Sequence, residues 1–361
     1  MTASEGFRTR VSIRQFVAPA QSHSFETARM EELRHALRSS PFYPEQLLAP
    51  VSVHALFPPT EFELDLYLHP ASNGRRSLYA SIGHRPTVAD LERLIADGLK
   101  TLYVPREQIG AFNENLERLL ASDIELAAAA RFEIAKEAAK GNFAAAWCRA
   151  SSDSLIASAT QLSERVIEAC RSADETSGLL SSMLAHDGST FSHVTNVCAY
   201  GVLLAMNLGV SDERTLGEIG VGGLLHDIGK RFIVPDILRK PGRLTPDERR
   251  LIEQHPTKGF EELCRRSDMT QGQLSMVYQH HERIDGSGYP VRAVESEIHW
   301  MAKLCAIVDV FDALTGRRAY RAPASIDDAL EYLTQRSGTF FDPEMVRCWK
   351  SVFSTQATAV T

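Results

Sequence analysis

The sequence predicts a two-domain protein in which a small N-terminal α+β domain precedes an all-α helical bundle. Three observations lead to this fold class. The chain has 361 residues, which is more than one compact core usually organises. Alternating, strand-like patterns occur only before residue 106, and helical patterns fill the sequence from residue 183 onward. We therefore expect an N-terminal domain of unknown role over 1–122 (core about 45–122), a helical connector over 123–182 and a C-terminal domain over 183–361.

The elements of the N-terminal domain are expected in the order ββαβα. Residues 63–69 alternate apolar and polar side chains, and a turn-like segment separates them from a return strand over 76–81. An amphipathic helix over 87–99, with Thr87 as its N-cap, precedes a strand over 100–105 and a helix over 106–122. This order is typical of a small α+β domain.

The segment over 123–182 is alanine-rich and contains few turn residues. It fits a connector between the domains, or a helical face through which a homodimer forms. The alternative is an ordinary packing helix.

Farther along, Thr245 to Glu248 form a capping-box sequence with proline at the first helical position, which predicts the start of the helix that carries His255.

Composition excludes several classes of function. The formal net charge of -7 argues against a general nucleic-acid binder, because duplex affinity comes mostly from neutralised phosphates. The six cysteines are scattered without a CxxC pair, which is typical of reduced thiols in a cytosolic protein. No apolar run approaches the roughly 18 residues of a membrane helix, and the N-terminus lacks the apolar core of a signal peptide. We therefore expect a cytoplasmic protein that does not enter a membrane.

Metal-binding side chains recur in five clusters of the C-terminal region. They are His193, His226 with Asp227, His255, His280 with His281, and Asp309. A lone histidine on an apolar helix is more often a packed core residue, but five of the 12 histidines fall in such settings between residues 193 and 309. Facing helices of a bundle can point such ligands at one centre. Imidazoles mixed with carboxylates suit Fe, Mn or Zn, and several hard oxygens favour Fe and Mn.

The adjacent pairs indicate more than one ion. Neighbouring residues on a helix point about 100° apart, so we expect His280 and His281 to serve two ions rather than to chelate one. Asp227 can bridge the two ions through its two oxygens while His226 binds one of them. Two neighbouring ions are the arrangement that phosphoester cleavage commonly uses. The residues therefore predict a two-metal phosphoester hydrolase.

Two longer motifs resemble the signatures of a known family. GLLHDIGK (223–230) and HHERIDGSGYP (280–290) are similar to the two signatures of the HD-GYP family, a branch of the HD-domain metal phosphohydrolases. Further similar segments, among them IEQHPTKG and IVDVFDALTGRRAYR, extend the resemblance over about residues 183 to 353. It implies an HD-domain-like bundle and hydrolysis of cyclic di-GMP, a bacterial second messenger, to linear pGpG and in some members onward to GMP.

The resemblance implies the same seven ligands and adds further site residues. Lys230 corresponds to a cation near the scissile phosphate, and with Asp227 and Tyr289 it forms the expected catalytic group. Gly288 and Tyr289 belong to the loop that names the family and are expected to contact substrate. Arg318 and Arg321 stand where family members hold ligand phosphates or guanine, and arginine suits both.

One position departs from the family. Three-metal members carry a glutamate four residues before the first ligand histidine, where this chain has Ser189. We therefore expect two divalent ions, Fe or Mn, rather than three. Two alternatives to a cyclic di-GMP phosphodiesterase stay open. One is a binding or signalling module of weak activity that holds a dinucleotide or docks a partner such as a diguanylate cyclase domain. The other is a phosphodiesterase for a different dinucleotide.

Overall fold

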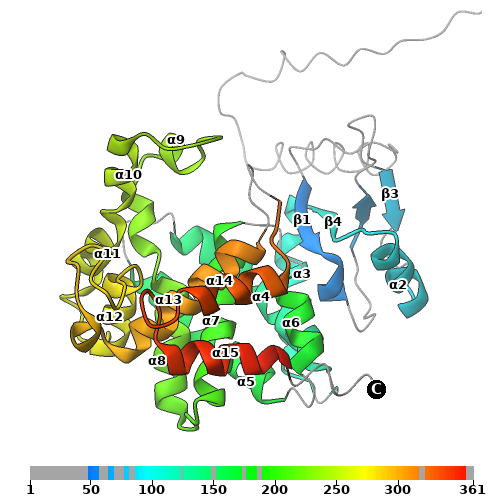
Figure 1. Ribbon diagram of the computed structural model, residues 1–361. Coiled ribbons are helices and arrows are strands. Elements are labelled where there is room, and N and C mark those ends of the chain that lie inside the picture. The colour runs from blue at the N-terminus through cyan, green and yellow to red at the C-terminus, as the bar shows by residue number, and fades with distance from the viewer. Residues whose placement is uncertain are drawn as a thin grey trace, which may run out of the picture.

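The computed structural model has a small sheet with its helices in one part and a larger helical bundle in the other (Figure 1). This confirms the predicted fold class. The described residues are 48–56, 64–68, 77–80, 86–122, 124, 126–147, 152–172, 176–184, 189–316 and 322–354. No helix among them is long and apolar enough to cross a membrane.

The N-terminal part is a four-stranded antiparallel sheet with the strand order β1-β4-β2-β3. Its elements are β1 (Leu48–Ser52), the 3-10 turn η3 (Val53–Leu56), β2 (Leu66–Leu68), β3 (Ser77–Ala80), α2 (Val88–Ala96), β4 (Thr101–Pro105), η4 (Arg106–Gln108) and α3 (Ile109–Leu120). Thr87 caps α2 as predicted, because its side chain accepts a hydrogen bond from the backbone N–H of Asp90.

Strand β1 is an element that the sequence pattern did not indicate. Its residues read LAPVS, which do not alternate and include Pro50. Proline has no N–H to donate, so a sheet tolerates it mainly at an edge. β1 is the edge strand and pairs with β4 from Leu48↔Pro105 to Ser52↔Thr101. Because β4 lies far along the chain, no local pattern could predict this pairing.

The remaining described elements are helical, apart from two isolated β-bridges. They are α4 (Ala128–Trp147), α5 (Asp153–Arg171), α6 (Thr176–Leu184), α7 (Thr190–Asn207), α8 (Glu213–Leu225), η5 (Ile228–Phe232), α9 (Pro235–Leu238), α10 (Pro246–Ile252), α11 (His255–Leu263), α12 (Gln271–Gln279), η6 (Glu295–Glu297), α13 (Trp300–Thr315), α14 (Ile326–Gln335) and α15 (Pro343–Ser354).

Helix α4 contributes to both hydrophobic cores. Ile134 and Ala138 belong to the core of the sheet, whereas Phe132 and Phe143 belong to the core of the bundle. Helices α5 and α6 also supply buried side chains to the bundle core. The domain boundaries expected from the sequence stay predictions.

Helix α7 runs through the middle of the bundle and is buried from Ser192 to Ala205. It packs against α8 and α13, and the rings of Tyr200, Phe311 and Trp349 meet edge to face at centroid distances of 5.2 to 5.5 Å. This aromatic contact joins α7, α13 and α15. It fixes α7 beside α13, and these two helices supply two of the candidate ligands.

The predicted capping box at Thr245 is present, with proline at the first helical position. The helix that it starts, α10, ends at Ile252 and does not deliver His255, which is the first residue of α11. Pro256 explains the difference. It has no N–H to donate to the carbonyl of Ile252, so a continuous α-helix cannot pass through this point.

Candidate metal centre

All seven predicted ligand side chains lie together in the interior of the bundle. His193 comes from α7 and Asp309 from α13, while His226 and His280 are the C-cap residues of α8 and α12. His226, His255 and His280 have no exposed surface, and Asp227 is 1% exposed. The sequence predicted this set, but it placed the ligands within helices, and several of them lie at helix ends instead.

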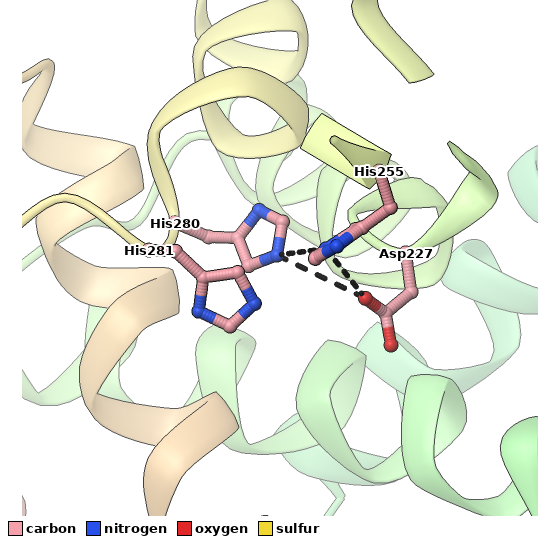
Figure 2. A group of neighbouring side chains, drawn as sticks. All are labelled: Asp227, His255, His280 and His281. Atoms are coloured by element: carbon pink, nitrogen blue, oxygen red, sulfur yellow. Dashed lines mark hydrogen bonds and ion pairs between the residues drawn. The ribbon is translucent and has the colours of Figure 1, made fainter. Parts of the chain in front are cut away.

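The ligand atoms form two groups that share Asp227. The first group is Asp227, His255, His280 and His281 (Figure 2), and the second is His193, His226 and Asp227, with the ligand atoms of each group within 4.8 Å of one another.

The two oxygens of Asp227 face different groups. Oδ1 lies 3.2 Å from Nε2 of His255 and 3.8 Å from Nε2 of His280. Oδ2 lies 3.6 Å from Nε2 of His193 and 3.5 Å from Nε2 of His226. Asp309 faces the second group, since its Oδ1 is 3.3 Å from Nε2 of His193. A bridging carboxylate needs this arrangement, and the bridging role stays a prediction.

The adjacent histidines differ from the expectation of one ion each. His280 and His281 fall in the same group, and their ring centroids are 4.2 Å apart. Helix α12 ends at Gln279, so His281 lies beyond the helix. The 100° spacing of helical neighbours therefore does not apply to this pair.

Helix ends hold three of the imidazole rings. The last carbonyls of a helix have no N–H partner within it, and here the Nδ1–H groups of histidines take that place. The hydrogen bonds are His226 to Gly223 O at 2.7 Å, His255 to Ile252 O at 2.8 Å and His280 to Met276 O at 2.9 Å. Because Nδ1 carries the hydrogen, the Nε2 lone pair of each ring is available to a metal ion.

Several atoms of the centre are not satisfied by the protein. Nε2 of His226 and Oδ1 of Asp227 are buried and have no hydrogen-bond partner among the described residues. Nε2 of His255 and Nε2 of His280 face each other at 3.1 Å with their lone pairs (Figure 2). A buried polar group left unpaired costs about 1–3 kcal/mol. Cations bound among these atoms would satisfy all of them, and imidazole nitrogens with carboxylate oxygens are donors that transition metals accept.

For most of these side chains, the pKa shifts favour the protonation state that binds a metal, which is a neutral imidazole or an ionised carboxylate. Burial lowers the pKa of His280 and of His281 well below the ordinary value, so both rings are neutral. Burial opposes the charge of Asp227, but Lys230 and the neighbouring histidines hold its pKa well below the usual range. Burial also lowers the pKa of His193, yet hydrogen bonds to surrounding aspartates outweigh it and raise that pKa. A bound cation would replace the proton there.

Lys230 lies at the edge of the centre. Its Nζ is 2.5 Å from Oδ2 of Asp227, and its side chain is 28% exposed. His226 and Lys230 do not lie on one helix, because α8 ends at Leu225 and Lys230 belongs to η5. Gly229 explains how η5 reaches α11, since a Cβ there would lie 1.8 Å from the carbonyl oxygen of His255.

The loop after the histidine pair folds back over His281. The Tyr289 ring stacks on the His281 ring at a centroid distance of 4.7 Å. Burial, together with the charges of Asp309 and Asp227, raises the pKa of Tyr289, so its phenol keeps its proton. Gly288 is buried, and a Cβ at this position would lie 2.5 Å from the backbone nitrogen of Arg283. Glycine is therefore required for this close approach, and substrate contact by Gly288 stays a prediction.

Glu282 is a site residue that the sequence reasoning missed. It is 2% exposed, and its carboxylate accepts hydrogen bonds from the backbone N–H groups of Val291, Arg292 and Ala293 at 2.8 to 3.1 Å. Arg292 has a φ of 60°, which residues other than glycine rarely adopt. Glu282 therefore fixes the loop that carries Tyr289. Its position directly after the histidine pair was the available signal.

Three further predicted positions need separate statements. Arg318 and Arg321 lie outside the described residues. Ser189 is the N-cap of α7, and its side chain accepts a hydrogen bond from the backbone N–H of Ser192 at 3.1 Å. This hydroxyl therefore has a structural role at the helix end.

Comparisons with known proteins show which family and which relatives the chain resembles. Residues 178–345 match the HD domain family. The chain is 36% identical over 163 residues to the cyclic di-GMP phosphodiesterase PA4108 of Pseudomonas aeruginosa, covering 45% of this chain and 39% of the relative. It is 35% identical over 204 residues to the cyclic di-GMP phosphodiesterase response regulator RpfG of Xanthomonas campestris, covering 55% of this chain and 54% of the relative.

A third relative has another substrate in its name. The 3'3'-cGAMP-specific phosphodiesterase 2 of Vibrio cholerae is 34% identical over 169 residues, covering 46% of this chain and 32% of the relative. The chain thus spans about half or less of the length of these relatives. Among solved structures, Bd1817, a HDG"Y"P protein from Bdellovibrio bacteriovorus, superimposes with a TM-score of 0.61 at 17% identity, covering 85% of this chain and 99% of that one. This likeness concerns the fold.

Proposed function

We propose that residues 178–345, which match the HD domain family, form a domain of the HD-GYP type and make this chain a metal-dependent phosphodiesterase that opens cyclic di-GMP to linear pGpG. The observation that carries the proposal is Asp227, whose two oxygens face two different groups of buried imidazoles. Such a pair of groups suits two metal ions, which together serve phosphoester cleavage.

The ligand residues fit two divalent ions, with Fe and Mn preferred for the mixed nitrogen and oxygen donors. Asp227, His255, His280 and His281 would hold one ion, and His193, His226, Asp227 and Asp309 would hold the other. Bound there, the ions would polarise the phosphate and lower the pKa of the attacking water. Ser189 supplies no carboxylate, so two ions rather than three remain part of the proposal.

The site residues that are not metal ligands act on the substrate directly. Water adds to phosphorus and gives up a proton, the bond from phosphorus to the 3′ oxygen breaks, and the leaving oxygen takes up a proton, so that the step is balanced. Lys230 stabilises the negative charge that develops on the phosphate, because its ammonium group lies at the edge of the centre and is partly exposed. Tyr289 keeps its proton and donates a hydrogen bond to a phosphate oxygen. Arg318 and Arg321 bind phosphate or guanine.

The relatives support the substrate class. Two of them are named for cyclic di-GMP, and one is named for 3'3'-cGAMP, which makes a cyclic dinucleotide with one adenine the second candidate substrate. We place the protein in the cytoplasm. As protein partners we propose a diguanylate cyclase domain that docks on this chain and a second copy of the chain in a homodimer.

The deciding experiment combines metal analysis with turnover. The full chain is purified, loaded with Fe or Mn under reducing conditions, and incubated separately with cyclic di-GMP and 3'3'-cGAMP, with the products resolved by chromatography. We expect two ions per chain and pGpG as the product. Binding of cyclic di-GMP without cleavage by the loaded protein would replace the enzyme with a ligand-sensing module. A third fully occupied ion near Ser189 would contradict the metal number.

A further inference from the structure

His193 differs from the other anchored histidines in the partner of its Nδ1. His226, His255 and His280 donate to backbone carbonyls, whereas Nδ1 of His193 lies 2.7 Å from Oδ2 of Asp312. Asp312 is 1% exposed and stands one helical turn after Asp309 on α13. A carboxylate on Nδ1 fixes the tautomer and orientation of a metal-binding imidazole and raises its basicity.

Asp312 is in turn held by Asn196, which is fully buried on α7. The Asn196 amide donates one N–H to Oδ1 of Asp312 at 2.8 Å and the other to the carbonyl oxygen of Met183 at 2.9 Å. The first bond fixes the rotation of the Asp312 carboxylate. The second ties Asn196 to the last turn of α6. His193, Asp312 and Asn196 therefore form one hydrogen-bonded row from the centre to α6.

We propose that Asp312 and Asn196 are positioning residues that aim Nε2 of His193 and thereby set the metal affinity of the second group. The inference rests on the proposed function in taking His193 as a ligand. The two groups of ligands would then differ. A carboxylate supports His193 of the second group, whereas backbone carbonyls support His226, His255 and His280. Neither Asp312 nor Asn196 touches the substrate.

The cost of this arrangement argues against a purely structural role. Oδ1 of Asn196 is buried and has no hydrogen-bond partner in the part of the chain that the structure describes. A buried polar atom without a partner lowers the stability of a fold, and well-packed apolar side chains often replace buried ion pairs without loss of stability. The protein retains this row despite its cost in stability, and the benefit is a fixed orientation of the His193 ring.

The test uses the full chain, freed of metal and titrated with Mn²⁺ while free Mn²⁺ is followed by electron paramagnetic resonance. Asp312→Asn keeps the shape of the side chain and an acceptor for Nδ1–H but removes the charge. We expect one of two Mn²⁺ ions to bind about 10–100-fold more weakly, the scale for loss of such a supporting group, and the other ion to keep its affinity. Asn196→Ala should weaken the same ion, and it should add nothing in the Asp312→Asn background.

Thr195→Val is the matched control, because it removes a buried hydroxyl of α7 that donates to the backbone carbonyl of Phe191 and not to the row. It should leave both affinities unchanged. The free energy of unfolding of each metal-free variant is measured in urea, which separates lost affinity from lost folding. Equal weakening of both ions, or of neither in Asp312→Asn, would overturn the proposal. A wild type that binds two Mn²⁺ without cleaving cyclic di-GMP contradicts only the enzyme, and one that binds none contradicts both proposals.

Discussion

The metal centre and the charged cluster on α4 both bury acids and bases, but they satisfy them in different ways. The α4 cluster consists of Glu133, Lys136, Glu137 and Lys140. Oε1 of Glu133 accepts from Lys136 at 3.0 Å and from Ser182 at 2.6 Å. Glu137 accepts from Lys140 at 3.3 Å and from the backbone N–H of Ser52 at 3.2 Å.

The α4 cluster has two acids, two lysines and partners from β1 and α6, so the protein itself neutralises it. In the metal centre, Nε2 of His226 and Oδ1 of Asp227 have no hydrogen-bond partner among the described residues. The difference separates two uses of buried polarity. A cluster that is paired within the protein joins elements together, and one that is left unpaired calls for a ligand. Four experiments test whether the two clusters differ in this way.

The largest effect is expected from Asp227→Ala. The two groups of ligands lose their shared negative partner, so turnover should fall by more than about 10³-fold, beyond the usual loss for one preorganised group. Elemental analysis should show fewer ions than the two that we expect in the wild type. Retention of both ions with near-normal turnover would show that Asp227 does not bridge.

Glu133→Ala makes the opposite prediction for the α4 cluster. It leaves the Lys136 ammonium, whose side chain is 10% exposed, without its carboxylate. Breaking a buried pair costs about 3–5 kcal/mol, which urea denaturation of the full chain would detect. Metal content and kcat per folded molecule should stay at the wild-type level. Loss of metal at unchanged stability would erase the distinction between the clusters.

Lys230→Ala should lower kcat by about 10²-fold, because the group acts mainly on charge that develops in the transition state. Metal content should be retained, since Lys230 is not a ligand. Lys140→Ala, which removes the partner of a buried carboxylate that is not among the candidate ligands, is the matched control and should leave kcat unchanged. A rise in KM at constant kcat would instead assign Lys230 to substrate binding.

The smallest effect concerns the pH dependence of stability. Burial raises the pKa of Glu137 despite its bonds to Lys140 and Ser52. The Glu137 carboxyl group therefore binds a proton more tightly in the folded state than in the unfolded state. Its contribution to stability increases as the pH falls and is lost as the pH rises through the pKa of the folded state. Relative to Glu137→Gln, the wild type should gain stability in urea denaturation as the pH is lowered from neutral toward the ordinary glutamate pKa. Parallel pH profiles would contradict this.

Much of the site could be predicted from the sequence because its ligands belong to distinctive local patterns. HDIGK and the adjacent His280 and His281 carry chemistry that is rare in ordinary helices, and their shared occurrence indicated one centre. Glu282, Asn196 and Asp312 were missed. Each resembles an ordinary polar residue until its partner is known, and the partners of Asn196 and Asp312 lie on other helices.

Sequence patterns were sufficient to predict the order of strands and helices from residue 63 onward, the all-α character of the second half and the set of candidate ligands. These properties follow from periodicity and side-chain chemistry, which act over a few residues. The pairing of β1 with β4, the shared group of His280 and His281, and the contact of Asp312 with His193 became visible in the folded structure alone. Those outcomes depend on where helices end and on which distant segments meet, because burial and hydrogen bonding are satisfied across the whole fold and not along the chain.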